Sequence, residues 1–416
     1  MHKISFVKKS EYAAGANHPY KHIQKSGERM EKLNNYLVPD YYGDFHCKMG
    51  ACRNACCEGW PITLSLKDYY KLLGAEVSGE LRIKLDCALH LVERPTNEEY
   101  AQILPRYDGR CPMRMDDGRC ALHYELGEDA LSDVCRLYPR GVRSGEIREC
   151  SCANSCEAVV EMLMERNDKI MFRSVPLKLK APVQGERKHY FETAGCEMEI
   201  RMHLISVLQD RSRKLTDRIA LLGMTLKHLS EALKASDHEW VEKILKNEET
   251  IEIPFSVHPA HEDLMRGLEI ANQMLRLLDE KSESIREYGT QALDAFGSGE
   301  HEFTVYSRRK EKFEKAFPNW EIWFEHMLVN HIFFVQFPFQ DRPVDLGDEY
   351  LALLSVYMLL RFLLIGNAEN DREKAADVAS AVFRLVEHTE FDCFAAPMLK
   401  RICMNDYENA IRLLSL

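Results

Sequence analysis

The sequence lacks several features that would place it in common functional classes. Its 66 acidic residues outnumber its 55 basic ones, so the net charge of −11 provides no basic excess for general nucleic-acid binding. The longest apolar run, residues 350–366, contains Arg361 and is shorter than the roughly 20 residues that a membrane span needs. We therefore expect no nucleic-acid partner and no membrane insertion, and we interpret this run as a core helix.

Two further signals are missing. The first residues, MHKISFVKKSEYAAG, show no apolar stretch and no small-residue cleavage site of the secretory kind, so we expect a cytoplasmic location. No predicted strand is followed by a G-x-G-x-x-G turn, and the nearest approach, GSG at 297–299, falls between helical patterns. A Rossmann-like domain is therefore not expected.

Cysteine is abundant but unevenly distributed. Eleven of the 14 cysteines lie in residues 47–156, and four of them fall within residues 47–57. A chain of this length can bury a large core without disulfides. In a reducing compartment, clustered cysteines more often serve metal or redox chemistry than structural disulfides. The sequence therefore predicts a metal or cluster site in the first half of the chain.

Eight of these thiols have suitable positions for such a site. They are Cys47, Cys52, Cys56 and Cys57 in one run, Cys111 and Cys120 on either side of the Asp117-Gly118 turn, and Cys135 and Cys156 in predicted helices. One zinc ion takes only four ligands. An iron-sulfur cluster can gather thiolates from separate segments, because each iron needs one. We favour the cluster, with zinc bound by Cys111, Cys120, His123 and Cys135 as the alternative.

The adjacent pair Cys56 and Cys57 allows more than one role. Neighbouring side chains usually diverge, so the two thiols could serve different metal positions, or one could bind while the other packs. A disulfide between them is less favoured in the cytosol. A catalytic thiol is less favoured still. Such a nucleophile needs a partner base, and it gains nothing from neighbouring thiols.

Local patterns place the cysteines on short elements. Ser65 and Asp68 form a capping box, and Gly74 provides a stop signal, so a short helix is expected between them. The run ELGEDALSDVCRLYPR predicts a helix that carries Cys135 and ends at Pro139. The run ECSCANSCEAVVEML predicts another helix with Cys150, Cys152 and Cys156 at its start.

The second half is helical by pattern. In residues 197–233, for example, apolar side chains recur at steps of three and four. We predict a mainly α fold: a cysteine-rich α domain with a short β-hairpin, followed by an all-α C-terminal domain. The expected divisions are a flexible basic extension at 1–30, the metal- or cluster-binding domain at 31–173, a linker at 174–195, and a helical substrate-recognition domain at 196–416.

Several segments together resemble a known family. YLVPDYYGDFHCKMGACRNACCEGWPI, CPMRMDDGRC, ELGEDALSDVCRLYPR, SCEA, FEHMLVNHIFFVQFPF and YMLLRFLLIGNA are similar to segments of the bacterial flagellin lysine-N-methylases. The cysteine-rich part of that family is similar to a wider CxxCxxCC iron- or zinc-binding family. Here, four and three residues separate the early thiols, which departs from the CxxCxxCC spacing. The resemblance covers nearly everything after about residue 35.

The resemblance implies an enzyme. Its expected activity is N-methylation of surface lysines of flagellin, with S-adenosylmethionine as methyl donor and a [4Fe-4S] cluster. The family's cysteines fall on Cys47, Cys52, Cys56, Cys57, Cys111, Cys120, Cys135 and Cys156, whereas Cys87, Cys150 and Cys152 have no counterpart. The alternative function is a zinc- or iron-binding interaction module without catalysis. Nothing in the sequence indicates the oligomeric state.

Methyl transfer to lysine requires the neutral amine, whose ordinary pKa is about 10.4. A carboxylate, a tyrosine or a desolvated pocket must therefore take a proton. No catalytic residue can be named from the sequence. Arg136, Tyr138 and Arg140 are candidates for contacts with the methyl donor, with capping of their own helix end as the alternative.

Overall fold

The computed structural model describes residues 34–143, 147–179, 193, 195–253, 261–278, 283–340, 345–405 and 407–416. The extension expected at 1–30 lies outside the described residues, as do residues 180–192 and 194 of the expected linker. Strand β7 continues to Leu177, so the first residues of that linker belong to a sheet.

The predicted mainly α class is confirmed. The helices in the described residues are α1 (Leu66–Leu73), α2 (Gly79–Ala88), α3 (Ala121–Leu126), α4 (Asp133–Leu137), α5 (Glu157–Glu165), α6 (Glu197–Leu208), α7 (Leu215–Lys234), α8 (His238–Leu245), α9 (His261–Leu278), α10 (Glu283–Phe296), α11 (Gly299–Ala316), α12 (Trp320–Phe334), α13 (Leu346–Asn367), α14 (Arg372–His388), α15 (Phe391–Ile402) and α16 (Tyr407–Ile411). Short 3-10 helices are η2 (Asp40–Asp44), η3 (Glu128–Ala130) and η4 (Arg412–Ser415).

The cysteine-rich half contains more β structure than the single hairpin that we expected. Its strands in the described residues are β1 (Asn34–Pro39), β2 (Ile62–Leu64), β3 (Leu89–Leu91), β4 (Ala101–Ile103), β5 (Arg140–Arg143), β6 (Glu149–Cys152) and β7 (Phe172–Leu177). They form a sheet of order β5-β6-β1-β7, in which β1 and β6 are parallel, and an antiparallel sheet of order β2-β4-β3. A local sequence pattern cannot predict pairing between strands that lie far apart in the sequence.

Helix α13 is the centre of a large helical body. It packs against α7, α10, α14 and α15, and its residues from Tyr350 to Gly366 are buried. By length and composition alone this helix is apolar enough to cross a membrane. Burial of residues 350–366 confirms the interpretation of this run as a core helix.

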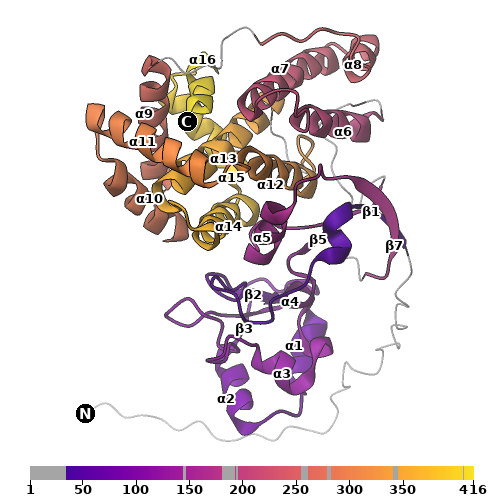
Figure 1. The fold of residues 1–416 in the computed structure, drawn as a ribbon. Helices are drawn as coiled ribbons and strands as arrows, with labels where there is room; N and C mark the ends of the chain where they lie inside the picture. The colour runs from indigo at the N-terminus through magenta and orange to yellow at the C-terminus, as the bar shows by residue number, and fades with distance from the viewer. Residues whose placement is uncertain are drawn as a thin grey trace, which may run out of the picture.

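The four-stranded sheet and α5 belong to the same large body. Tyr36 and Val38 of β1 and Val159 and Leu163 of α5 share one hydrophobic core with the C-terminal helices. Figure 1 shows α5 below α12 and beside α14, with the sheet to the right of α5. This core therefore crosses the boundary that we expected near residue 173.

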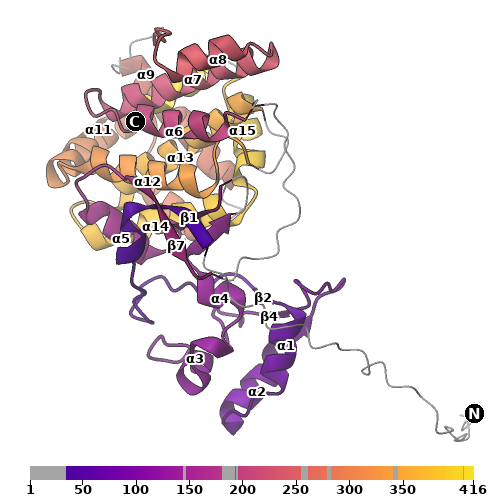
Figure 2. The ribbon, with the colours of Figure 1, turned by 90° about the vertical axis from the view of Figure 1, so that its right-hand side faces the viewer.

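A separate small lobe lies below that body, as both views show (Figures 1 and 2). It comprises β2, β3, β4 and α1 to α4, and its own core includes Leu64, Leu72, Leu85 and Met113. The predicted capping box of α1 is confirmed, because the Ser65 hydroxyl accepts a hydrogen bond from the Asp68 amide at 3.1 Å.

The predictions of two helices are wrong in part. The chain around Cys135 forms η3 and then the short helix α4, because Ser132 caps a new turn by accepting from the Cys135 amide. Cys150 and Cys152 lie in β6, and only Cys156 stands at the start of helix α5. Residues 149–152 pair with β5 and β1, and this tertiary pairing overrides the local helical interpretation.

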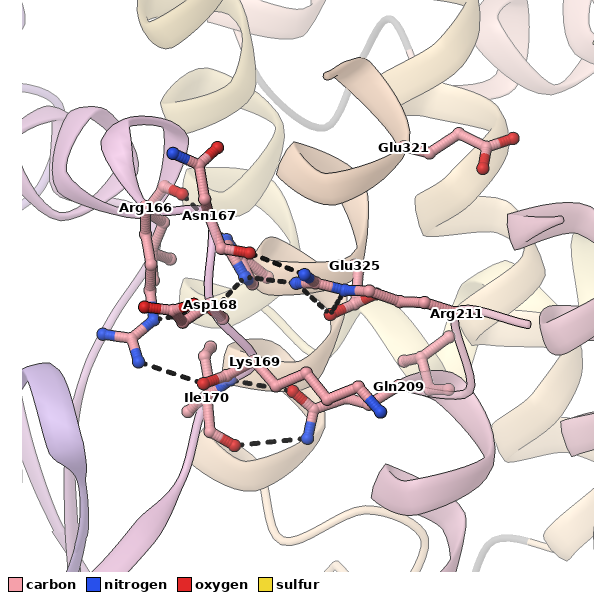
Figure 3. A network of polar contacts seen from close by, with 12 residues as sticks. Arg166, Asn167, Asp168, Lys169, Ile170, Gln209, Arg211, Glu321 and Glu325 are labelled. Atoms are coloured by element: carbon pink, nitrogen blue, oxygen red, sulfur yellow. Dashed lines mark hydrogen bonds and ion pairs between the residues drawn. The ribbon is translucent and has the colours of Figure 1, made fainter. Parts of the chain in front are cut away.

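Polar contacts connect the segment before β7 to the helical body (Figure 3). Arg211 donates to the Glu325 carboxylate at 2.8 Å and to the carbonyl oxygen of Asn167 at 2.6 Å. Gln209 exchanges two hydrogen bonds with the backbone of Ile170. These bonds fix the chain between α5 and β7 against the helical body.

Candidate metal centre

Seven of the eight predicted ligands line one cavity of about 420 Å³ in the small lobe. They are Cys47, Cys52, Cys56, Cys57, Cys111, Cys120 and Cys135. Each is a free thiol, as is Cys156 at the N-terminus of α5. The other cysteines of this half lie elsewhere: Cys87 is exposed on α2, and Cys150 and Cys152 are buried in β6.

A close backbone approach brings the first cysteine run to the hairpin. Gly50 and Gly118 both have positive φ, and a Cβ built on Gly118 would lie 2.2 Å from the Gly50 carbonyl oxygen. Only glycine fits both positions, because each combines the left-handed region with the absence of space for a side chain. The Asp117-Gly118 turn that the sequence predicts therefore packs against the loop between Cys47 and Cys52.

The hairpin also pairs with the segment after the cysteine run. The Cys111 amide donates to the Cys57 carbonyl oxygen at 2.8 Å, and Glu58 forms a β-bridge with Arg110. The Glu58 carboxylate forms ion pairs with Arg114 and Arg110. These contacts hold Cys57 beside the base of the hairpin.

Cys156 approaches the same run from the large body. The next residue, Glu157, has a carboxylate that accepts hydrogen bonds from the amides of Arg53 at 3.1 Å and Asn54 at 2.8 Å. The Lys48 ammonium group lies 3.0 Å from this carboxylate. Glu157 is buried, so it anchors the loop that carries Cys52 and Cys56 to the start of α5.

Burial keeps most of these thiols protonated. It raises the pKa of Cys111 to about 12 and the pKa values of Cys135 and Cys156 to about 11. The hydrogen bond between the Cys56 and Cys57 thiols raises the pKa of Cys56 and lowers that of Cys57, which also faces the Arg114 guanidinium. Metal binding requires thiolates, so it must release protons here and must strengthen as pH rises.

The donor set fits an iron-sulfur cluster in kind. It consists of thiols from separate segments, and soft thiolates are the ligands that such clusters use. Within the described ranges, no three His, Cys, Asp or Glu side chains converge closely enough to hold a single metal ion. The four residues of the alternative zinc site, Cys111, Cys120, His123 and Cys135, all line the cavity. The ligand assignment therefore stays a prediction.

Of the three residues predicted to contact the methyl donor, Tyr138 lines the cavity. Arg136 forms an ion pair with Asp133 within α4. Arg140 stacks over the rings of Phe45 at 5.0 Å and Tyr42 at 5.8 Å. Of these three residues, only Tyr138 therefore lines the cavity that the seven thiols surround.

Tyr138 begins a hydrogen-bonded chain that the sequence did not reveal. Its hydroxyl donates to the Ser155 hydroxyl at 3.1 Å, and the Ser155 oxygen lies 2.8 Å from Nε2 of His388. Burial lowers the pKa of His388, with Glu387 opposing this shift and Arg384 reinforcing it. The imidazole is therefore neutral at pH 7 and can accept the Ser155 proton. Trp60, another cavity residue, packs on the same imidazole at 4.8 Å.

Comparison with known proteins identifies the family. The model of the FliB lysine N-methylase C-terminal domain matches residues 201–414, just over half of the chain. The chain belongs to this family. The match covers the helical body and confirms the resemblance to the flagellin lysine-N-methylases.

Individual relatives match over a shorter stretch of 133 residues. Two of them are named Lysine-N-methylase, from Salmonella choleraesuis (strain SC-B67) and Salmonella typhimurium (strain LT2). Each is 31% identical to this chain over the matched stretch, which covers 31% of this chain. The match spans about a third of those proteins, 32% of each. The Flagellar biosynthetic protein FliU of Salmonella muenchen is 30% identical over 77% of its length. No solved structure matches the chain.

Proposed function

We propose that this chain is a protein lysine N-methyltransferase that transfers methyl groups from S-adenosylmethionine to surface lysines of flagellin in the cytoplasm. Membership of the FliB lysine N-methylase family supports the methyl transfer. The name of the FliU relative supports a flagellar substrate. The helical domain, which carries the family match, is the part that we assign to recognition of the protein substrate.

The thiols around the cavity would hold an iron-sulfur cluster, with [4Fe-4S] as our first choice and zinc as the alternative. The support is chemical: eight free thiols from five segments of the chain approach one another, and seven of them line one cavity. Backbone hydrogen bonds connect these segments in pairs. A bound cluster would in addition link them through covalent metal–sulfur bonds.

The observation that carries the catalytic proposal is the chain from Tyr138 through Ser155 to His388. S-adenosylmethionine supplies a methyl group on a positively charged sulfur. The lysine nitrogen forms the new N–C bond, the C–S bond breaks, and one amine proton must leave. Tyr138 can accept this proton at its oxygen while its own proton passes to Ser155 and the Ser155 proton passes to Nε2 of His388.

Incubation of the purified protein with flagellin and S-adenosylmethionine labelled in the methyl group tests the activity. We expect label on flagellin lysines, located by peptide mass spectrometry. Tyr138→Phe removes the hydroxyl that starts the relay and should lower kcat strongly while it leaves flagellin binding unchanged. Tyr124→Phe is a matched control, because Tyr124 lines the cavity but forms no part of the relay. Absence of label with the wild-type protein would favour the non-catalytic interaction module.

A further inference from the structure

Two aromatic rings meet at the wall of the cavity. Trp60 stands two residues before β2 and Tyr138 directly follows α4, so the packing of α4 against β2 brings the two rings together. Their centroids lie 6.0 Å apart with an interplanar angle of 60°, and both side chains line the cavity. His388 of α14 packs on both, with centroid distances of 4.8 Å to Trp60 and 6.0 Å to Tyr138. The large body therefore holds this ring pair, Trp60 and Tyr138, in place.

The cavity wall offers a bound cation few other partners. Among the residues that line it in the described part of the chain, none is Asp or Glu. Its two arginines are already paired, Arg114 with Glu58 and Arg119 with Asp117 at 2.6 Å. Arg119 also lies over the ring of Tyr124 at 4.8 Å, so that ring already has a cation. The ring pair is therefore the part of the wall that is best suited to a cationic ligand.

The geometry of the ring pair favours a compact cation. An aromatic face attracts a positive charge, and the attraction strengthens where water is excluded. A flat purine base would need two nearly parallel faces, which an angle of 60° does not provide. A small cation needs only to approach each ring to within about 6 Å of its centroid. The cavity of about 420 Å³ lies within the usual range for small-molecule sites, about 300–1,000 Å³, so the cation can belong to a larger molecule.

We propose that Trp60 and Tyr138 bind the sulfonium group of the methyl donor at the wall of the thiol-lined cavity. The sulfonium of S-adenosylmethionine is positively charged but has no N–H or O–H, so it is recognised by ring faces rather than by hydrogen-bond acceptors. After methyl transfer the sulfur is neutral, and the ring pair holds the product, S-adenosylhomocysteine, less tightly. This difference favours product release. The inference rests on the proposed function for the identity of the donor.

Isothermal titration calorimetry of the full-length protein, purified without oxygen, tests the ring pair without catalytic turnover. We expect the wild type to bind S-adenosylmethionine about 10-fold more tightly than S-adenosylhomocysteine, because only the former carries the charge. Equal binding of the two, tighter binding of S-adenosylhomocysteine, or no binding of either would overturn the inference. This comparison needs no variant.

Substitutions then separate the ring faces from the Tyr138 hydroxyl. Trp60→Leu should weaken S-adenosylmethionine binding about 10-fold and S-adenosylhomocysteine binding less than about twofold. Tyr138→Phe keeps its ring and should bind the donor as the wild type does, whereas Tyr138→Leu should bind it more weakly. Tyr124→Leu is the matched control, because this cavity ring already lies under Arg119. Equal loss of both ligands in Trp60→Leu would show apolar contact alone and contradict recognition of the charge.

A peptide that contains trimethyllysine offers a second methylated cation. If Trp60→Leu abolished binding of this peptide but left donor binding unchanged, the rings would belong to the methylated product, and the donor assignment would be overturned.

The same measurements separate this inference from the proposed activity. Charge-selective donor binding through the ring pair without methyl transfer by the wild type would uphold the inference and contradict the proposed function. Methyl transfer with donor binding that is independent of both rings would do the reverse.

Discussion

Glu157 provides the sharpest structural prediction. Glu157→Ala removes the carboxylate that accepts the Arg53 and Asn54 amides and pairs with Lys48. Hydrogen bonds to a charged group contribute about 1.5–3 kcal/mol each to stability. The two bonds together contribute more than about 3 kcal/mol to stability. After the substitution, however, water can hydrogen-bond to part of the loop and offset some of this loss. We therefore expect local opening of this loop to become easier by about 3 kcal/mol, which is roughly a 100-fold change in an equilibrium constant.

Amide hydrogen exchange measures this change directly, because protected amides exchange through local opening. The Arg53 and Asn54 amides should exchange about 100-fold faster in Glu157→Ala than in the wild type, with little change in the core helix α13. Glu165→Ala removes an exposed carboxylate from the end of the same helix and serves as the control. Unchanged exchange at Arg53 and Asn54 in Glu157→Ala would refute the assignment of Glu157 as the anchor of this loop.

Three further outcomes are expected. Cys152→Ser should keep its metal but lose about 1–3 kcal/mol of stability in chemical denaturation, because it places a hydroxyl in a fully buried position; unchanged stability would contradict this. Gly118→Ala should separate the hairpin from Gly50 and lower metal content, whereas Gly79→Ala, with open space around it, should not. Methyl transfer should fall only below about pH 6.5, where His388 protonates and can no longer accept the Ser155 proton, and His388→Gln should show no such fall.

The pH prediction follows from the direction of the shift. Burial lowers the folded-state pKa of His388, so the neutral form persists to a lower pH than in the unfolded chain, whose ordinary value is about 6.5. The stability that neutral His388 provides is complete above that value. It decreases as pH falls from there through the folded-state pKa, because the unfolded chain then binds the proton more readily.

Local chemistry was sufficient for much of the fold. The Ser65 cap, the Asp117-Gly118 turn and the buried helix around 350–366 all depend on neighbours in the chain. The spacing of the cysteines likewise indicated a thiol site from local counting alone.

Tertiary structure decided the remainder, because the residues concerned lie far apart in sequence. Cys150 and Cys152 belong to a strand because β1 and β5 pair with it, which no helical periodicity can report. Ser155 and His388 are separated by 233 residues and meet only when α14 packs beside α5. The sequence by itself therefore determined the local elements and the supply of thiols, and the packing of distant segments decided which side chains meet.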